Sequence, residues 1–291
     1  MKVVVTILYV DELTINLSID SVRKQTQLPD DIVVIEGFCG AKNGITAEID
    51  YGYKCGCDIL ITTTGDAIIK PNLVKTYLEA IQKRKDVYMF DCYGDDVMLQ
   101  PAPSGVWVMD MNVIQDKYRP GRDGCGIGLH WDSDFFNKVA KRTGLKRECI
   151  KKNLVIHHPI WTPYEMYGKV RATLPRYFRK SKKGIRQFKE FFEQGLKLYP
   201  GNLTLRVGYD LYNKMIGNLP KWNMNNKRFD LIREEWEEFK KSYVLTGEEF
   251  FAMVGWEETA KKLVKENLTK GKVEISFPIK RVGEKDLYGG P

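Results

Sequence analysis

The chain lacks the features that mark membrane-spanning and secreted proteins. Its 291 residues contain no apolar run of about 18 residues, the length that a membrane-spanning helix needs. Residues 1–6 have neither the apolar length nor the small-residue cleavage site of a signal peptide. The sequence also has no internal repeat and no low-complexity tract. These absences predict a cytoplasmic protein, and a hydrophobic content of 43% is enough for a substantial core.

The six cysteines are scattered along the chain, and their spacing excludes the usual metal and redox motifs. Cys55 and Cys57 are separated by one residue, whereas zinc knuckles and thioredoxin-like pairs place two residues between their cysteines. We therefore expect the six cysteines to be buried or partly buried thiols, with a disulfide only if the source is a hyperthermophile. They are Cys39, Cys55, Cys57, Cys92, Cys125 and Cys149.

Acidic residues are fewer than basic ones, which favours anionic partners. The chain has 46 Lys and Arg against 38 Asp and Glu, a net charge of +8, and this charge attracts nucleotides, phospholipid headgroups or nucleic acid. The excess is concentrated in residues 165–200, where Phe188, Phe191 and Phe192 form an apolar stripe beside Lys and Arg. The pattern fits a solvated helical surface or a helix lying on a membrane. No recognised motif supports nucleic-acid binding, so none is expected.

The order of apolar patterns predicts an α/β fold. Over the first 90 residues, β-branched runs alternate with helical periodicity, the signature of βαβ units and a parallel sheet. The expected strands are 3–8, 32–35, 59–63 and 87–91, and the expected helices are 13–25, 45–53 and 73–84. We then expect a strand at 105–109, a helix at 131–143 and a strand at 152–158. From about residue 165 helical patterns dominate, before a β segment at 272–282.

A single acid follows the third expected strand. Asp66 comes after the run 59–64 and one glycine, Gly65. Open α/β sheets bind ligands at the carboxyl ends of their strands, and a carboxylate there can hold a divalent metal by its oxygens. The competing interpretation is an ordinary helix N-terminal acid, since a helical pattern follows Pro71. The residues alone leave both interpretations open.

Several short motifs follow one another in an order that resembles a known family. They are Ser21-Val22-Arg23-Lys24-Gln25-Thr26 before the turn Pro29-Asp30, Ile32-Val33-Val34-Ile35-Glu36-Gly37, Ala41-Lys42-Asn43-Gly44-Ile45, Thr64-Gly65-Asp66, Gly105-Val106-Trp107-Val108-Met109, Asp132-Ser133-Asp134-Phe135 and Ile156-His157-His158. Over about residues 1–160 this order resembles the family 2 glycosyltransferases of the GT-A fold. The resemblance implies a catalytic domain at 1–163, with a Rossmann-like, mostly parallel mixed sheet flanked by helices, and a mainly helical C-terminal extension at 164–291.

The resemblance also implies which residues bind the nucleotide. Tyr9 is expected near the base, and Glu36 is expected to read the base, because an ionised carboxylate accepts hydrogen bonds from its N–H groups. Lys42, Asn43 and Gly65 match segments that lie beside the nucleotide.

A metal role is implied for the acid at the strand end. Asp66 matches the last acid of an Asp-x-Asp-like element and would ligate Mg²⁺ or Mn²⁺ together with a diphosphate. His158 or His157 matches a late histidine that touches the metal or the diphosphate, although a histidine pair before a proline is often structural. Gly65 stands where many members of the family carry a second acid.

A catalytic role is implied for the acids that open the helix at 131–143. Asp132 matches the general base that takes the proton of the acceptor, and Asp134 is expected to bind the acceptor, although both also fit as cap and first-turn acids. Trp107 is expected either to line the acceptor site or to be a core aromatic.

The implied activity is inverting transfer of a sugar from a nucleotide-sugar donor to an acceptor glycan, protein or lipid, assisted by a divalent metal. One alternative is a polyprenyl-phosphate glycosyltransferase that contacts the inner membrane surface peripherally through residues 165–200. The other is a nucleotide-sugar-binding protein without catalysis, motivated by Gly65 in place of the second acid.

Overall fold

The chain forms two compact units. Unit 1 comprises Met1–Asp123, His130–Pro159 and Lys270–Pro291, and unit 2 comprises Gly124–Leu129 and Ile160–Thr269. The computed structural model describes residues 1–10, 12–38, 41–96, 102–114, 118, 131–157, 160–180, 182–198, 200–218, 229–242, 251–252 and 279–289. The predicted division gave the whole of 164–291 to a helical extension, whereas the last residues of the chain belong to unit 1.

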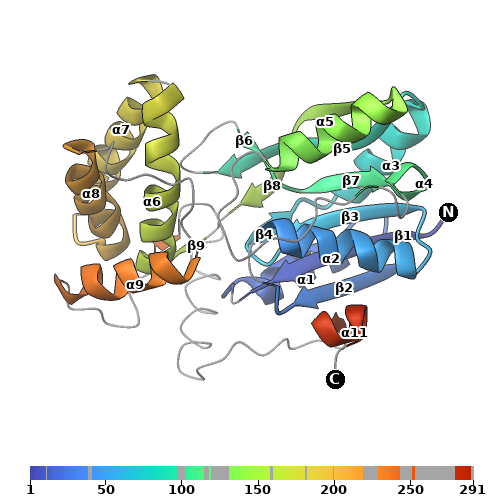
Figure 1. Cartoon of the computed structure of the whole chain (residues 1–291), viewed down its shortest axis with the longest axis horizontal. Helices are drawn as coiled ribbons and strands as arrows, with labels where there is room; N and C mark the ends of the chain where they lie inside the picture. Colours follow the sequence, from blue (N-terminus) through green and yellow to red (C-terminus); the bar gives the residue numbers. More distant parts are fainter. Residues whose placement is uncertain are drawn as a thin grey trace. The chain divides into compact units, whose positions relative to one another are not determined.

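Unit 1 is built on one mixed sheet. The central strand β1 (Val3–Tyr9) pairs in parallel with β2 (Asp31–Glu36) on one side and with β3 (Ile59–Thr64) on the other. The full order is β11-β2-β1-β3-β7-β5-β8-β4, with β6 paired to β5 (Figure 1). The other strands are β4 (Ala67–Ile69), β5 (Val87–Asp96), β6 (Ala102–Pro103), β7 (Trp107–Asp110), β8 (Lys146–His157) and β11 (Lys280–Val282). The pairs β11–β2 and β5–β8 are parallel, whereas β7 is antiparallel to both of its neighbours.

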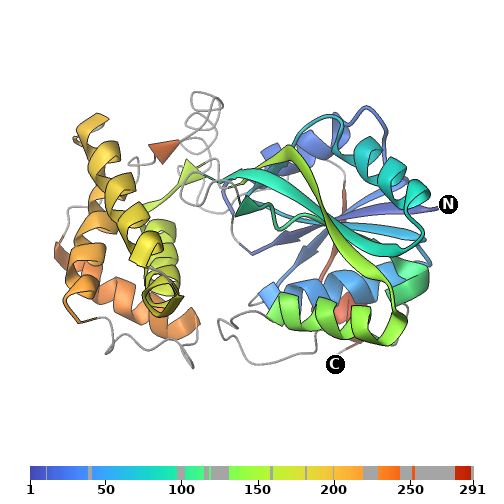
Figure 2. The ribbon, with the colours of Figure 1, turned by 90° about the horizontal axis from the view of Figure 1, so that it is seen from above.

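Helices cover both faces of this sheet. Figure 2 shows α1 (Ile15–Arg23) and α3 (Leu73–Lys83) on one face. The opposite face carries α2 (Ala41–Lys54), α4 (Met111–Ile114), α5 (Trp131–Thr143) and α11 (Glu284–Tyr288). The predicted α/β class is therefore confirmed as a mixed sheet between two layers of helices, followed by a mainly helical region.

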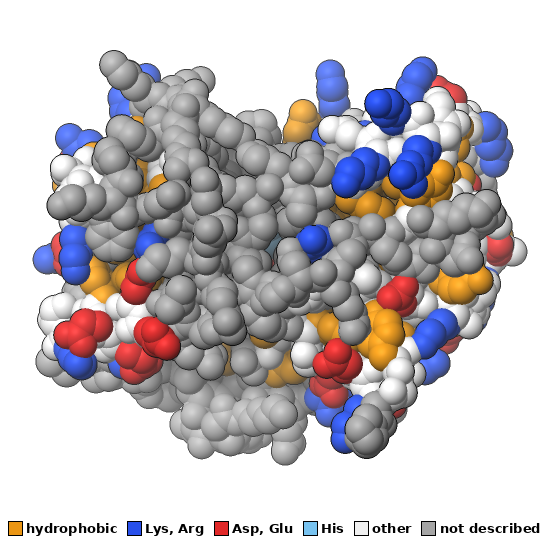
Figure 3. Space-filling model, in the orientation of Figure 1, with side chains coloured by type: hydrophobic (Ala, Val, Ile, Leu, Met, Phe, Trp, Pro, Cys, Tyr) orange, Lys and Arg blue, Asp and Glu red, His pale blue; other side chains and the backbone are white. Residues whose placement is uncertain are grey.

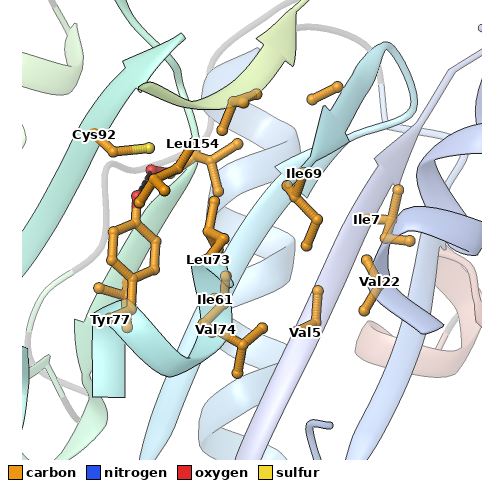
Figure 4. Close-up of a cluster of buried hydrophobic side chains, with 14 of the residues drawn as sticks. Val5, Ile7, Val22, Ile61, Ile69, Leu73, Val74, Tyr77, Cys92 and Leu154 are labelled. Carbon is orange, nitrogen blue, oxygen red and sulfur yellow. Dashed lines mark hydrogen bonds between the residues drawn. The ribbon is translucent and has the colours of Figure 1, made fainter. Parts of the chain in front are cut away.

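The two faces of the strands have separate cores, because successive side chains point to opposite sides. Val3, Val5, Ile7 and Tyr9 of β1 contribute to the core under α1 and α3, and Val4 and Leu8 contribute to the core under α2. Figure 4 shows the first core, in which the Tyr77 hydroxyl donates a hydrogen bond to the Val106 carbonyl oxygen at 2.7 Å. Both faces of β1 are apolar, as expected for a strand buried on both sides.

Helix α2 approaches the sheet closely at its glycines. A Cβ on Gly44 would lie 2.3 Å from a methyl carbon of Leu8, and a Cβ on Gly52 would lie 3.1 Å from Leu60. Glu48 lies one turn from each glycine and is completely buried beside Thr6. Within the described part of the chain, neither carboxyl oxygen of Glu48 has a hydrogen-bond partner. Burial therefore raises the pKa of Glu48 well above its usual range.

The predicted elements are recovered, most of them with shifts of a few residues at their ends, and several short elements were missed, among them β4, β6 and α4. The pattern after Asp66 was interpreted as leading into a helix, but residues 67–69 form β4. This strand pairs in antiparallel register with β8, with Ala67 opposite His157. Helix α3 begins only at Leu73, so Asp66 does not cap it.

The C-terminal segment completes the sheet. Strand β11 pairs in parallel with β2, with Arg281 opposite Val34 and Val282 opposite Ile35. Helix α11 then packs on the α2 side of the sheet, where Leu287 is buried and the Tyr288 hydroxyl donates to Asp50 at 2.5 Å. The predicted β segment is thus present at residues 280–282, and residues 271–278 lie outside the described residues.

Unit 2 is mainly helical. Its elements are α6 (Pro163–Lys180), α7 (Lys182–Leu198), α8 (Leu203–Ile216), α9 (Phe229–Phe239), the 3₁₀ turn η2 (Lys240–Ser242) and the paired strands β9 (Ile160–Trp161) and β10 (Phe251–Ala252). Two of the three rings expected to form a membrane-facing stripe, Phe188 and Phe192, are buried. Phe192 packs against Tyr209 and Tyr212 of α8. The stripe is thus largely core, because the apolar face of an amphipathic helix is covered here by a neighbouring helix.

Basic side chains gather on the surface of unit 1. Helix α5 and strand β8 carry exposed Lys138, Lys141, Arg142, Lys146 and Arg147, and Figure 3 shows a cluster of Lys and Arg over this part of the molecule. Among the described helices, none is both long enough and apolar enough to cross a membrane.

Candidate functional site

The carboxyl ends of the three parallel strands meet at one edge of the sheet. The chain leaves β1 for α1 on one face and leaves β2 for α2 on the other, so β1 and β3 form a switch point in the strand order. A crevice opens at such points in open α/β sheets and is where ligands bind. In register, Tyr9 of β1 lies opposite Glu36, and Leu8 lies opposite Thr64. The strand ends that the sequence singled out are therefore neighbours.

Asp66 and His157 lie together at this edge. His157 Nε2 is 3.7 Å from Asp66 Oδ1, and the two side chains are 20% and 18% exposed, so solvent reaches both. The Thr64 hydroxyl also donates to Asp66 Oδ1. The contact arises because β4 turns back directly after Asp66 and pairs with the end of β8. On the other side of β8, the backbone of Asp96 is the register partner of His157.

The turn that carries Asp66 is fixed by hydrogen bonds from the start of α1. The Thr14 hydroxyl donates to the Gly65 carbonyl oxygen at 2.8 Å, and the Ser18 hydroxyl donates to the Thr64 carbonyl oxygen at 3.0 Å. The Gly65 N–H donates to the Leu8 carbonyl oxygen at 2.9 Å. Because the carbonyl groups of Thr64 and Gly65 are both hydrogen-bonded, the turn holds the Asp66 carboxylate in place before any ligand binds.

Glu12 is a residue of this edge that the sequence did not reveal. Its carboxylate accepts a hydrogen bond from the Val10 N–H at 2.7 Å. A Cβ on Gly65 would lie 3.0 Å from Glu12 Oε2 and 3.1 Å from Glu12 Cβ. Glu12 therefore occupies the space that a side chain at position 65 would need, and a carboxylate is present where the expected second acid is missing.

Glu36 is held by the last strand of the sheet. Arg281 Nη2 lies 3.4 Å from Glu36 Oε2, and the two side chains are 45% and 34% exposed. This pair is accessible to solvent, so its contribution to stability is small. Because Glu36 lies at the end of β2, it is at the ligand-binding edge of the sheet. No sequence pattern indicated that the Arg281 guanidinium would lie beside it.

The other expected nucleotide-binding residues differ in accessibility. Lys42 and Asn43 are partly exposed in the first turn of α2, a helix N-terminus that favours anions. Tyr9 is only 4% exposed and belongs to the core under α1. Its ring is buried because it shares the face of Val5 and Ile7, which separates it from a surface on which a base could stack.

Trp107 is partly buried and packs edge-on against Phe136, with ring centroids 5.1 Å apart. This contact accounts for Trp107 as a core aromatic, and its acceptor role stays a prediction.

The backbone of Asp132 and Asp134 lies in the first turn of α5, and the side chains of both residues are outside what the structure describes. His158 is outside the described residues as well.

The donor atoms at this edge suit a metal that shares its coordination with a ligand. Among the described residues, no group of three or more His, Cys, Asp or Glu side chains could hold a metal ion by itself. Mg²⁺ is usually bound by one or two carboxylates together with substrate phosphates rather than by a cage of protein ligands. A carboxylate and an imidazole, both reached by solvent, fit that kind of site.

Comparisons with known proteins add a likeness of fold. No protein-family model matches the chain, and no curated protein matches it. Among solved structures, it resembles glucosyl-3-phosphoglycerate synthase from Mycobacterium tuberculosis in complex with Mn²⁺, uridine diphosphate and phosphoglyceric acid, at 13% identity and TM-score 0.44, over 60% of this chain and 76% of the other. It also resembles S. aureus TarS at 11% identity and TM-score 0.43, over 67% of this chain and 44% of the other.

A further resemblance is to CMP:2-keto-3-deoxy-manno-octonic acid synthetase complexed with CTP, at 9% identity and TM-score 0.38, over 53% of this chain and 91% of the other. Similarity at this level carries no argument about ligands or reaction, which must come from the site itself.

Proposed function

We propose that unit 1 binds a nucleoside-diphosphate sugar at the carboxyl edge of its sheet and transfers the sugar to an acceptor hydroxyl or phosphate. One observation carries the proposal: the pair of Asp66 and His157 is partly exposed at the switch point between β1 and β3. Glu36 lies at the end of the neighbouring strand, and the N-terminus of α2 carries Lys42 and Asn43. In this arrangement, Glu36 can accept hydrogen bonds from the base, and Lys42 with the N-terminus of α2 offers positive charge to a diphosphate. The carboxylate of Asp66 offers oxygens to a metal.

The residues have distinct tasks in the proposed reaction. Asp66, supported by His157, would hold Mg²⁺ or Mn²⁺ against the diphosphate. The bound metal would neutralise the charge of the leaving diphosphate. Glu36 would accept hydrogen bonds from the base, which requires its contact with Arg281 to rearrange or to widen.

Asp132 is proposed as the general base. The acceptor oxygen attacks C1 of the sugar, the bond between C1 and the diphosphate oxygen breaks, and the acceptor proton passes to the Asp132 carboxylate. Direct attack inverts the configuration at C1. A positioned carboxylate contributes about 10²–10⁴-fold to the rate of such a step, and Asp132 lies in the first turn of α5, in the same unit as Asp66.

Binding tests the metal site separately from turnover. We expect nucleoside diphosphates, screened by calorimetry with and without Mn²⁺, to bind more tightly when the metal is present. Asp66→Asn should weaken the metal-dependent binding by about tenfold or more, the scale of loss seen when groups supporting a metal are removed. Asp20→Asn is the control, because Asp20 lies on α1 and pairs with Lys24 one helix turn away. Equal binding by Asp66→Asn and the unchanged protein would remove Asp66 from the site.

Turnover separates the enzyme from a protein that only binds. Donor hydrolysis and transfer, measured over a panel of nucleotide sugars and acceptors with Mn²⁺, should fall by at least about 10²-fold in Asp132→Asn while nucleotide affinity is unchanged. Metal-dependent binding with no turnover of any donor would favour the nucleotide-sugar-binding protein and would reject the transferase.

A further inference from the structure

A pair of cysteines lies at the opposite edge of the sheet from the proposed site. Helix α2 ends at Lys54, and Cys55, Gly56, Cys57 and Asp58 connect it to β3. Gly56 has a positive φ of 64°, and the Cys57 N–H donates to the Gly52 carbonyl oxygen at 3.1 Å. Such a left-handed glycine after a helix reverses the chain. The two cysteines are therefore folded back against the last turn of α2.

Both sulfur atoms converge on one residue of that turn. The Cys55 thiol donates to the Gly52 carbonyl oxygen at 3.4 Å. Cys57 Sγ lies 3.2 Å from the point that a Cβ of Gly52 would occupy. Neither cysteine is in a disulfide. Gly52, which has no side chain, leaves room for Cys57 Sγ.

The backbone around the pair is firmly held. The Asp58 N–H and the Ile59 N–H donate to the Lys2 carbonyl oxygen at 2.9 and 3.1 Å, and the Lys2 ammonium donates to the Cys55 carbonyl oxygen at 2.9 Å. The turn is thus attached to Lys2, the residue directly before β1. The backbone on both sides of the two cysteines is therefore fixed.

The two thiols differ in reactivity. The neighbouring Cys57 thiol, helped by the charge of Lys2, lowers the pKa of Cys55 to about 6, whereas the neighbouring Cys55 and burial raise the pKa of Cys57. Cys55 is partly exposed and Cys57 is buried. A partly exposed thiolate beside a buried thiol is the arrangement of an attacking and a resolving cysteine.

We propose that Cys55 and Cys57 form a thiol–disulfide exchange site that reacts with low-molecular-weight disulfides and closes to a Cys55–Cys57 disulfide. The Cys55 thiolate attacks one sulfur of the small disulfide, whose S–S bond breaks and releases one thiolate. Cys57 then loses its proton and attacks the Cys55 sulfur, which breaks the mixed disulfide and releases the second thiolate. The two protein thiols are oxidised, and the small disulfide is reduced to two thiols.

The geometry favours a disulfide over a metal at this pair. Consecutive Cα atoms are about 3.8 Å apart, so the Cα atoms of two residues separated by one other residue in a turn are near the separation of about 4.4–6.8 Å that a disulfide spans. Among the described residues, no third His, Cys, Asp or Glu joins the two sulfurs in a group able to hold a metal. The proposal is independent of the proposed transferase activity.

Mass spectrometry of one peptide tests the proposal. Trypsin releases residues 55–75, because Lys54 precedes this segment and Lys70 is followed by Pro71, and the peptide contains no other cysteine. The full chain is treated with oxidised glutathione, free thiols are alkylated, and the mass of the peptide is measured. We expect the peptide to carry no alkyl groups and to be two hydrogens lighter than its reduced, unalkylated form. A peptide that stays fully alkylated, or that carries glutathione without closing, would overturn the proposal.

Variants identify the order of attack. In Cys57→Ser, the mixed disulfide of Cys55 with glutathione should accumulate at least about tenfold above its level in the unchanged protein, because the intramolecular step is lost. In Cys55→Ser the peptide should stay almost unreacted. Cys149→Ser, a change in a single thiol on β8, should leave the result at residues 55–75 unchanged. Equal accumulation of the mixed disulfide with and without Cys57 would rule out Cys57 as the resolving thiol. Circular dichroism checks that each variant is folded.

Discussion

At the scale of single residues, Glu48 stands out as a buried acid whose carboxyl oxygens accept no hydrogen bond from the described part of the chain. It is fully buried under α2, and none of the described residues satisfies its carboxyl oxygens. An ionised carboxylate in such a place is very costly, so the group stays protonated instead. Because burial raises the folded-state pKa, the contribution of Glu48 to stability is complete below its unfolded pKa. It is lost as the pH rises toward the folded value.

Replacing Glu48 by glutamine should therefore change stability in a pH-dependent way. Near about pH 4 the variant and the parent should be similar, and above it Glu48→Gln should gain about 1.4 kcal/mol per pH unit relative to the parent, until the folded pKa is reached. Urea unfolding at several pH values measures this difference. Glu79→Gln, an exposed acid on α3, should show no such slope. A difference for Glu48→Gln that is constant with pH would contradict an elevated folded pKa.

The candidate site could be predicted from the sequence only in part, and residue contacts explain why. Asp66 was found because an acid after a buried strand is a local pattern. Glu12 and Arg281 were missed because their places depend on contacts across 53 and 245 residues, with Gly65 and Glu36 respectively. Nothing in the local sequence of either residue distinguishes it from an ordinary surface charge. The choice of His157 at Asp66 likewise required the pairing of β4 with β8.

At the scale of elements, the approach of α2 to the sheet depends on a glycine. A Cβ on Gly44 would lie 2.3 and 2.6 Å from the two methyl carbons of Leu8. In an isolated helix, alanine would be favoured over glycine by about 1 kcal/mol. The crowding acts in the opposite direction, because overpacking a filled core costs about 1–3 kcal/mol.

Gly44→Ala should thus destabilise unit 1 by about 1–2 kcal/mol, the balance of overpacking against helix propensity. Gly168→Ala is the matched control, since Gly168 lies in α6 and a Cβ there would meet nothing within 4 Å. The control should be neutral or stabilising by up to about 1 kcal/mol. Denaturant unfolding of both variants measures the contrast. A stabilising Gly44→Ala would show that Leu8 moves aside without cost.

Element order was largely predictable, because each buried strand and amphipathic helix carries its own periodicity. The helix at 131–143 was predicted with the ends that α5 has. The failures have physical causes: β4 has three residues, too few to establish a period of two, and β6 has only two. Such short strands form because a longer partner offers free backbone groups, which the sequence of the short strand does not record.

At the scale of the whole molecule, each unit has its own core, and unit 2 contains a buried ion pair. Arg171 of α6 is only 2% exposed, and its Nε lies 2.7 Å from Glu235 Oε2 of α9, whose side chain is 26% exposed. A second contact joins Arg171 Nη2 and Glu235 Oε1 at 3.3 Å. Removing the partner of a buried guanidinium leaves an uncompensated charge, which costs more than the intact pair contributes.

Glu235→Gln should therefore destabilise unit 2 by about 2–3 kcal/mol, somewhat less than for a fully buried pair because Glu235 is partly exposed. Hydrogen exchange should rise in α6, α7 and α8 and stay unchanged in β1, β2 and β3. Glu190→Gln, which breaks an exposed pair with Arg186 on α7, should cost about 0.5 kcal/mol or less. Equal acceleration of exchange in both units would show that they unfold together.

The return of the chain to β2 has a consequence for the order in which the protein is made. Unit 2 is inserted within unit 1, and β11 pairs with β2 only after more than 240 residues have intervened. On the ribosome, β2 emerges early and its outer edge stays without a neighbour until nearly all of the chain has been synthesised. An unpaired, apolar strand edge is a template for other chains. Nascent chains that stop after unit 2 should therefore aggregate or recruit chaperones through β2, although most of the sheet is already present.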